Sequence, residues 1–464
     1  MMKNVRKALA LAAAVFLTAG MLGGCKPQSP AGSEGGGSQG AGSSTPSGER
    51  KEPITLTYAS WDKDELNEFL VQKFEQMYDY VTVELVKIDQ NSWEQGLFNL
   101  ATTGDLPDAF WTFDLGSATV NGWTRDITSI YDADEYTKKI PVDIRAAGVY
   151  GGKRYGLAVH QFPWVVFVNK TLFEQANVPL PSYDWTLEDL YQTAKALSMP
   201  KQYIFGVSNP TDYFRDMYPA AFTENLFQFG FNPAEETFDL TLWADGYNEA
   251  KKYLNESIAE NLTAEEKEKA YGKADIWTPE TGKLGIQLDW FWTNTYMKSD
   301  AFTEKGIEWL IYPLPTGSSG RVTTTIDLGA VSATTEHPEE AYALLKFMTF
   351  GAEGWKARRD FYNFNHSRPS DLPLADDSEV WDVVREFTPG EDYAAVYESL
   401  SRAVPDIQKW LPGYGAWWSW SWEEDIWGKL QRGEAKPEDL SAQMGRKLKS
   451  CYDEAMTKIN ARSN

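Results

Sequence analysis

The chain has 464 residues, with 44 Lys and Arg against 67 Asp and Glu, so its formal net charge is −23. Its hydrophobic fraction of 42% and charged fraction of 24% exclude a mainly disordered or collagen-like chain. The length predicts two or three domains. The acidic balance argues against nucleic acid as the main partner, because phosphate binding requires clustered Lys and Arg. The 19 Trp and 23 Tyr are more than core packing alone accounts for.

The N-terminus has the pattern of an export signal. Residues 1–7 are short and basic, and residues 8–22 are apolar but too few to span a bilayer comfortably. The following Leu22-Gly23-Gly24-Cys25 resembles a bacterial lipobox. We therefore expect a lipoprotein signal peptide over residues 1–24 and lipidation of Cys25, which anchors the chain without spanning the membrane. The alternative is an ordinary secretory signal with an incidental cysteine.

A low-complexity segment follows. Gly, Ser and Pro supply 16 of the 26 residues from 26 to 51, and no large apolar side chain is available for a core. We expect residues 25–51 to form a flexible tether behind the lipidated cysteine. Two glycine motifs in the segment, G-x-G-x-x-G and G-x-S-x-G, are rejected because no strand precedes them and no helix follows. With Cys25 lipidated, Cys451 has no partner for an intramolecular disulfide.

From residue 53 onward, strand and helix patterns alternate. Residues 54–60 and 81–88 alternate like strands, and 108–112 reads as a third strand. Between them, residues 62–77 place Leu66, Leu70 and Phe74 on one helical face, with Asp62 as a candidate cap, and 92–103 reads as a second helix. This order predicts βαβ units and a parallel sheet. The acid-rich residues 255–273 predict a solvated helix.

From about residue 54 to about residue 456, the chain resembles the extracellular solute-binding proteins of bacterial ABC importers, specifically the sugar-binding family 1. The order and spacing of several short motifs carry the resemblance. Two positions depart from the family pattern: Ala158 stands where Pro is usual, and Asp327 lies in a stretch where glycines are more common. The matching motifs are Gly104-Asp105-Leu106-Pro107-Asp108, Gly152-Lys153-Arg154-Tyr155-Gly156-Leu157, Phe167-Val168-Asn169-Lys170-Thr171-Leu172-Phe173 and Pro313-Leu314-Pro315.

The resemblance implies an α/β fold of the periplasmic-binding-protein type, with two α/β lobes joined by a hinge of crossing segments. By analogy the chain crosses between the lobes near residues 159–161, 323–326 and 365–368. Lobe 1 would then comprise residues 52–160 and 325–366, and lobe 2 residues 161–324 and 367–464. Closure of the lobes around a ligand would exclude water and strengthen each hydrogen bond to it.

The resemblance also implies a function. We expect a receptor, lipid-anchored at the extracellular face of the cell membrane, that captures a carbohydrate and delivers it to the transmembrane permease subunits of an ABC importer. The number of aromatic clusters favours an oligosaccharide, because each further sugar ring needs its own stacking face. We expect a monomer that uses no cofactor and binds no nucleic acid. Three scattered histidines argue against a zinc site.

Sugars present flat C–H patches and hydroxyl edges, so aromatic faces and carboxylates or amides suit them. Aromatic and acidic residues cluster after the first and third strands, at the first crossing, after residues 282–288, and late in the chain, and Arg368 is a further candidate at the third crossing. For each aromatic side chain the alternative is a place in the core, and the five aromatics of residues 414–422 cannot all contact one sugar. The predicted ligand-binding residues are Trp61, Asp62, Trp111, Asp114, His160, Gln161, Trp290, Trp292, Asp327, Arg368, Trp417 and Trp418.

Two other functions stay open from the sequence. An extracellular carbohydrate-active enzyme would need two carboxylates flanking the scissile bond, and 67 acidic residues neither locate nor exclude such a pair. A binding protein for a peptide or another polar solute would share the same fold. A role in sensing rather than transport would look the same in sequence.

Overall fold

The computed structural model describes residues 51–462, and the chain from Glu52 onward forms one compact body. The predicted signal peptide (1–24), the predicted lipidation site Cys25 and nearly all of the predicted tether lie outside the described residues. Among the helices of residues 51–462, none is both long and apolar enough to cross a bilayer.

Two βα units begin the body, as the alternating patterns predict. β1 (Ile54–Ala59) pairs in parallel with β2 (Val81–Leu85) and β3 (Ala109–Thr112), and α1 (Asp64–Met77) and α2 (Trp93–Thr103) connect them. Leu66, Leu70 and Phe74 are buried on one face of α1, which confirms the predicted periodicity. The prediction that Asp62 caps this helix is wrong, because Lys63 is the N-cap residue and its side chain makes no capping hydrogen bond.

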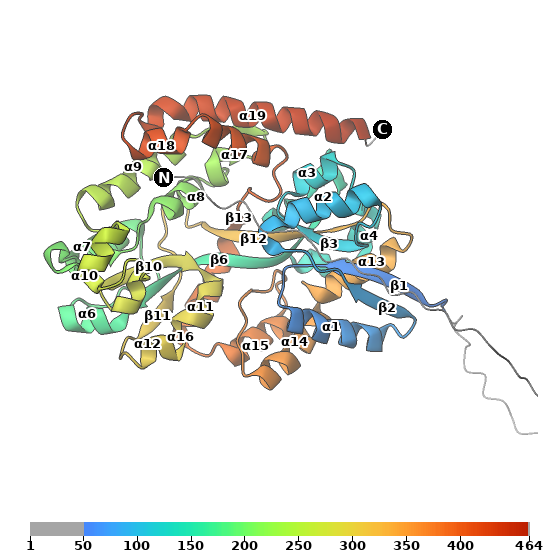
Figure 1. The fold of residues 1–464 in the computed structure, drawn as a ribbon, viewed down its shortest axis with the longest axis horizontal. Coiled ribbons are helices and arrows are strands. Elements are labelled where there is room, and N and C mark those ends of the chain that lie inside the picture. The colour runs from blue at the N-terminus through green and yellow to red at the C-terminus, as the bar shows by residue number, and fades with distance from the viewer. Residues whose placement is uncertain (1–50, 463–464) are drawn as a thin grey trace, which may run out of the picture. The chain divides into compact units, whose positions relative to one another are not determined.

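The central sheet is mixed rather than parallel. Within the described residues it has nine strands, and the seven on its main path have the order β2-β1-β3-β12-β6-β10-β7 (Figure 1). β12 (Val322–Val331) runs antiparallel to both β3 and β6 (Leu157–Asn169), and β10 (Leu284–Trp290) runs antiparallel to β6 but parallel to β7 (Phe205–Val207). The prediction of a parallel sheet therefore holds for β1–β3 and is wrong for the centre, where long connections let a strand enter in either direction.

The other strands are short. β11 (Trp309–Tyr312) pairs with β6, and β13 (Ala403–Pro405) pairs with β12. Two further pairs form two-stranded ribbons: β4 (Val149–Tyr150) with β5 (Lys153–Arg154), and β8 (Phe231–Asn232) with β9 (Thr237–Phe238).

The predicted solvated helix at residues 255–273 is shorter than expected. α10 (Ala264–Tyr271) has no buried residue, and the residues before it belong to α9 and a connection.

Helices cover both faces of this sheet (Figure 1). The further α-helices of the described chain are α3 (Leu115–Val120), α4 (Thr128–Ala133), α5 (Val142–Ala146), α6 (Lys170–Ala176), α7 (Leu187–Leu197), α8 (Thr211–Phe222), α9 (Thr241–Asn255), α11 (Asn294–Met297), α12 (Asp300–Thr303), α13 (Pro338–Met348), α14 (Ala352–Asn365), α15 (Ser378–Phe387), α16 (Glu391–Ser399), α17 (Tyr414–Glu423), α18 (Ile426–Gln431) and α19 (Pro437–Arg462).

Buried apolar side chains gather in two clusters, which correspond to the cores of two lobes. The first surrounds β1–β3 and the second surrounds β7, β10 and β11. Residues from α9 and α17–α19 also belong to the first cluster, although the sequence assigns residues 367–464 to lobe 2. This follows from the position of α19, which packs against both α3 and α9. The predicted lobe boundaries themselves stay a prediction.

Two long strands pass from one cluster to the other. On β6, Val159 belongs to the first cluster and Trp164 to the second; on β12, Val322 belongs to the second and Ile326 to the first. The crossing points expected near residues 159–161 and 323–326 stay a prediction. The two strands pair antiparallel there, so the connection between the cores is a stretch of sheet rather than a loose linker.

Replacing Gly206 by Ala should destabilise the second core. Gly206 lies in β7, where a Cβ would stand only 1.8 Å from the backbone oxygen of Ala194 in α7. Since a backbone cannot yield as a side chain can, we expect a loss of about 1–3 kcal/mol, measured by urea denaturation. Gly96→Ala is the control, because its Cβ would meet only the side chain of Ile88. Equal effects of the two substitutions would contradict this account.

Candidate binding cleft

The first part of the candidate cleft is built around Trp61, directly after β1. Its half-buried ring stacks on Phe113 with centroids 4.0 Å apart and planes 10° apart, and meets the buried Trp111 edge-on at 5.0 Å. Its indole Nε1 donates a hydrogen bond to Oδ2 of Asp327 at 3.2 Å. One face of Trp61 is thereby occupied by Phe113, and its polar edge is fixed by β12.

Asp327 is almost fully buried in the middle of β12 and forms an ion pair with Lys409. Within the described chain its carboxylate is bonded by Trp61 and Lys409. The Lys409 ammonium also stands 5.9 Å from the Trp61 ring centroid and 5.5 Å from that of Phe113. Sequence reasoning missed Lys409, because nothing in its local sequence marks a cation that pairs 82 residues away.

A buried polar network lies beside this group. His160 on β6 has its Nε2 within 3.2 Å of the Arg358 guanidinium and its Nδ1 within 3.3 Å of Asp371. Arg358 in turn stands 3.9 Å from the carboxylate of Asp62. Burial, followed by the charge of Arg358, lowers the pKa of His160 to about 4, so the imidazole is neutral at physiological pH. Burial also raises the pKa of Asp62 and Asp371.

Two predicted contact residues hold structure together. Gln161 is buried, donates through Nε2 to the carbonyl of Pro373 at 2.5 Å and accepts from Thr324 Oγ1 at 3.3 Å. Asp114 is the N-cap of α3 and accepts from both the backbone N and the Oγ of Ser117. Burial raises the pKa of Asp114. Within the described chain, Gln161 bonds to Pro373 and to Thr324 of β12, and Asp114 bonds to the first turn of α3. The polar groups of both side chains are therefore engaged within the protein.

The second part of the cleft is built around Trp290 at the end of β10. Its ring lies 3.9 Å from that of Trp164 and is nearly parallel to that of Trp292 at 4.9 Å and 11°. Its indole Nε1 donates to Thr325 Oγ1 at 3.2 Å. Trp292 keeps 40% of its surface exposed. An exposed Trp face held by a second ring offers the kind of platform on which a sugar ring can stack.

Thr325 and Asp327 connect the two parts. They are two residues apart on β12, so their side chains project from the same face of the sheet, and each accepts a hydrogen bond from one Trp. A continuous row of aromatic contacts links Trp61 to Trp290, with neighbouring ring centroids no more than 6.4 Å apart. The order is Trp61, Trp111, His160, Phe162, Trp292 and Trp290.

The third part lies between α8 and α17. Trp418 is half-buried there, and the guanidinium of Arg215 stands 5.8 Å from its ring and 5.9 Å from that of Trp427. These side chains line a cavity of about 640 Å³ together with Trp422 and residues of α9. Trp417, by contrast, is fully buried and donates to the carbonyl of Met444, so its predicted contact with a ligand is replaced by a place in the core.

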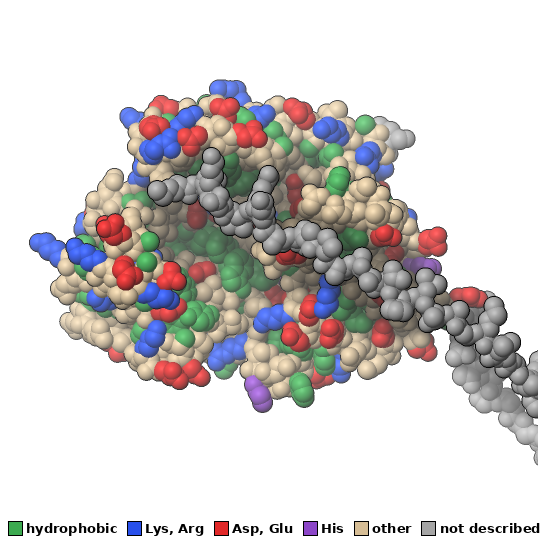
Figure 2. Space-filling model, in the orientation of Figure 1, with side chains coloured by type: hydrophobic (Ala, Val, Ile, Leu, Met, Phe, Trp, Pro, Cys, Tyr) green, Lys and Arg blue, Asp and Glu red, His purple; other side chains and the backbone are tan. Residues whose placement is uncertain are grey.

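This cavity adjoins a second one of about 260 Å³ beside Trp290, since Asn209 and Asp212 line both. The Trp418 and Trp290 parts are therefore neighbours in space. On the face drawn in Figure 2, hydrophobic side chains gather in a hollow near the centre, below the helices α17–α19. Sequence analysis did not predict Asn209, Asp212 or Arg215, because no aromatic–acidic cluster or family motif marks this segment around the start of α8.

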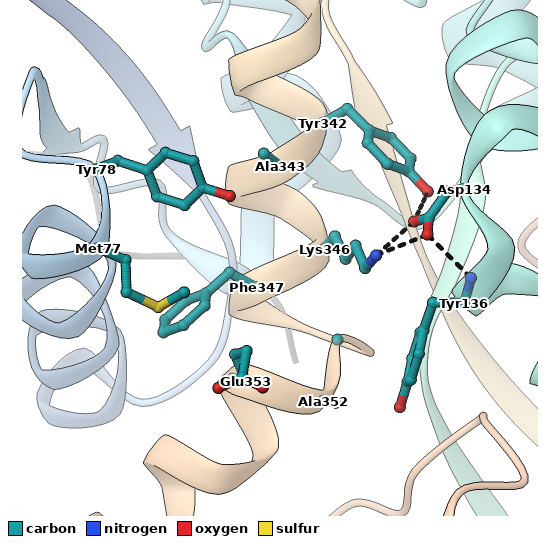
Figure 3. A pocket seen from close by; sticks show the side chains of 12 residues that line it. Met77, Tyr78, Asp134, Tyr136, Tyr342, Ala343, Lys346, Phe347, Ala352 and Glu353 are labelled. Carbon is teal, nitrogen blue, oxygen red and sulfur yellow. Dashed lines mark hydrogen bonds and ion pairs between the residues drawn. The ribbon is translucent and has the colours of Figure 1, made fainter. Parts of the chain in front are cut away.

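Arg368 does not join these groups. It is exposed and lies beside Tyr393 of α16, where its charge opposes the burial that raises the pKa of the Tyr393 phenol to about 12. A further cavity, of about 360 Å³, lies between α1 and α13 and is lined by none of the predicted residues. Figure 3 shows Met77, Tyr78 and Phe347 on one side of it and the contacts of Asp134 with Tyr342 and Lys346 on the other.

Comparison with protein families gives one match. Residues 59–350, more than half of the chain, match the family model described as bacterial extracellular solute-binding protein. No curated protein sequence matches the chain.

Solved structures share the fold at low sequence identity. An ABC substrate-binding protein from Listeria monocytogenes in complex with cycloalternan is 21% identical, with 88% of this chain and 100% of that chain covered and a TM-score of 0.62. The GacH receptor of Streptomyces glaucescens, solved without ligand and with acarbose, is 18% identical over 87% and 99% of the two chains, with a TM-score of 0.62. A sugar transporter from Rhizobium etli in an open conformation is 18% identical over 85% and 99%, with a TM-score of 0.66.

Proposed function

Because this chain belongs to the bacterial extracellular solute-binding proteins, we propose that it is the receptor of an ABC importer and captures a carbohydrate, specifically an oligosaccharide, between its two lobes. The proposed binding residues are those of the three aromatic groups: Trp61 with Asp327 and Lys409, Trp290 with Trp292, and Trp418 with Arg215. The structural relatives that were solved with cycloalternan and acarbose support a saccharide as the ligand class.

The observation that carries the proposal is the row of aromatic rings that joins Trp61 to Trp290 across β6 and β12. Polar groups accompany the row, namely the Asp327–Lys409 pair at one end and Thr325 near the other. A saccharide needs both features, because its C–H faces stack on rings while its hydroxyls require hydrogen-bond partners. The rings of the row that keep exposed surface, Trp61, Phe162, Trp290 and Trp292, fit several sugar units better than one.

The location and partners follow from the sequence and the family. We propose that Cys25 carries a lipid that anchors the protein at the outer face of the cell membrane, and that a monomer delivers its ligand to the permease subunits. We propose binding without turnover, since the family is one of binding proteins. Sugar release from a bound oligosaccharide, followed by chromatography, would instead reveal a carbohydrate-active enzyme.

The test is a titration of the purified protein with a panel of neutral oligosaccharides, by calorimetry and thermal shift. A ligand at 100 times its Kd should stabilise the protein by about 2.7 kcal/mol. Trp290→Ala should weaken binding by about thirtyfold, the equivalent of about 2 kcal/mol for a central Trp anchor.

Trp123→Ala is the matched control, because Trp123 is also half-buried but packs against Phe98 of α2. It should leave the affinity unchanged. If neither neutral nor amine-bearing saccharides bind, or if the two variants lose affinity equally, the proposal is overturned and the aromatic row is assigned to the core.

A further inference from the structure

The cavity beside Trp290 has a chemistry of its own, which the aromatic row does not explain. We name it the β10 notch; it arises because β10 continues past the end of β7. The ladder between the two strands ends at Ile286 and Val207, and Leu288 N then donates to Ser208 Oγ instead of to a strand. The space left beyond β7 is about 260 Å³ and is closed by α10 and by residues 277–279. That volume suits one sugar ring.

Three Trp residues line the β10 notch: Trp164, Trp277 and Trp290. Trp164 and Trp290 are in contact with each other, and Trp164 is nearly buried while Trp290 is half-exposed. A Trp face attracts a cation through its ring quadrupole, and the attraction grows when water is excluded. The aromatic walls alone would accept a neutral sugar or a cationic one, so the charges must discriminate.

The polar lining carries more negative than positive charge. Among the described residues, the lining has one basic residue, Lys267, against three acidic residues, Asp212, Glu260 and Asp289. Glu260 stands 3.6 Å from Lys267, and Asp212 pairs with Arg215 at 2.8 Å. Asp289 differs, because within the described chain its carboxylate bonds only neutral donors. These are Thr293 Oγ1 at 2.8 Å, the backbone N of Trp290 at 2.8 Å and Gln287 Nε2 at 3.1 Å.

Thr278 adds an independent polar group to the β10 notch. It lines the β10 notch, is 1% exposed, and its Oγ1 has no hydrogen-bond partner among the described residues. Buried hydroxyls normally find a partner, since an unpaired one costs free energy. Thr278 therefore offers a hydroxyl that is free to donate or accept a hydrogen bond. Asp289 offers a carboxylate that is not paired with a cation in the described chain.

We propose that the β10 notch binds a sugar ring that carries a protonated amine, with the ammonium held by the carboxylate of Asp289 within the aromatic walls of the notch. The ligand class is thus an amino sugar with a free amine. This inference rests on the proposed function, because the β10 notch shares Asn209 and Asp212 with the cavity of Trp418 and would hold one unit of a longer saccharide.

The test compares D-glucosamine, D-galactosamine, D-glucose and N-acetyl-D-glucosamine by calorimetric titration of the purified wild-type protein in neutral buffer at low salt. At least one of the two amines should bind tenfold or more tightly than the neutral sugars, and the preference should shrink as salt is added. The wild-type comparison needs no variant. Failure of both amines to bind, or binding of the neutral sugars with equal affinity, overturns the inference.

Asp289→Asn keeps the size of the side chain and should abolish the preference for the amine. Asp275→Asn is its control, because Asp275 is 80% exposed on the segment that leads to the β10 notch. A preference that survives in Asp289→Asn also overturns the inference. The neutral oligosaccharide panel separates the two proposals: tight binding there without any preference for amines sinks the amino-sugar assignment and leaves the receptor function standing.

Discussion

Replacing Arg358 by Met should lower the free energy of unfolding by about 3–5 kcal/mol, the usual loss when one member of a buried charge network is removed. Arg358 is fully buried in α14. Its guanidinium donates to the carbonyl of Thr349 at 3.2 Å and to that of Met348 at 2.7 Å. These carbonyls end α13, where no further helical turn supplies donors, so the guanidinium serves as the C-terminal cap of that helix.

The same substitution removes the positive charge beside two buried carboxylates. Asp62 and Asp371 would lose a cation that favours their ionised forms. His160 would lose the neighbour that, after burial, does most to lower its pKa. We therefore expect the pKa of His160 to rise from about 4 in Arg358→Met, which NMR can follow because the chain has only three histidines.

Arg359→Met is the matched control. Arg359 is the next residue of the same helix, but its side chain is 40% exposed and pairs with Glu386. An exposed ion pair contributes about 0–1 kcal/mol, so urea denaturation of this variant should differ little from that of the wild type. Losses of similar size in the two variants would show that the network around Arg358 is not the source of the stability.

The local structure of the first lobe could be predicted from the sequence, because alternation and helical spacing are local signals. β1–β3 follow the predicted order, with ends that differ by a few residues. The pairing of β12 with β3 and β6 could not be predicted, because it joins residues more than 150 positions apart in sequence and antiparallel entry leaves no local mark. The same holds for the bond between Trp61 and Asp327, which spans 266 positions.

The candidate site shows a second limit. Trp417 and Trp418 are neighbours on α17, so their side chains point in directions about 100° apart, and only one of them can face the core. Sequence analysis predicted that both residues bind the ligand, because aromatic residues occur all around this helix and do not define an apolar face. Packing decides the choice: Trp417 reaches Met444 of α19, while Trp418 faces Arg215 and the cavity. Which aromatics bind and which fill the core thus depends on helices that pack later in the chain.

Replacing Asp406 by Asn should stabilise the protein above neutral pH and leave it nearly unchanged in acid. Asp406 is 4% exposed, and within the described chain its Oδ1 has no hydrogen-bond partner. Lys409, the nearby cation, pairs with Asp327. Burial is therefore the main cause that raises the pKa of Asp406 from 3.8 to about 7, while Lys409 opposes the shift and Asp216 adds to it.

The sign follows from proton binding. Between about pH 4 and pH 7 the folded protein holds a proton on Asp406 that the unfolded chain releases, so this proton stabilises the fold below pH 4 and the benefit is lost as the pH rises through 7. The interval between 3.8 and about 7 corresponds to about 4 kcal/mol at 1.36 kcal/mol per pH unit. Asn carries no proton to lose, so Asp406→Asn should gain up to that amount over the wild type at about pH 8.

Urea denaturation at about pH 4 and about pH 8 measures both differences. Asp382→Asn is the control, because its carboxylate is 64% exposed, and its effect should be small and equal at the two pH values. A loss of stability in Asp406→Asn at pH 8 would mean that the carboxylate is ionised in the fold and paired with Lys409. In that case Asp327 would share Lys409 with a second carboxylate, and the ion pair that holds Asp327 against Trp61 would be weaker.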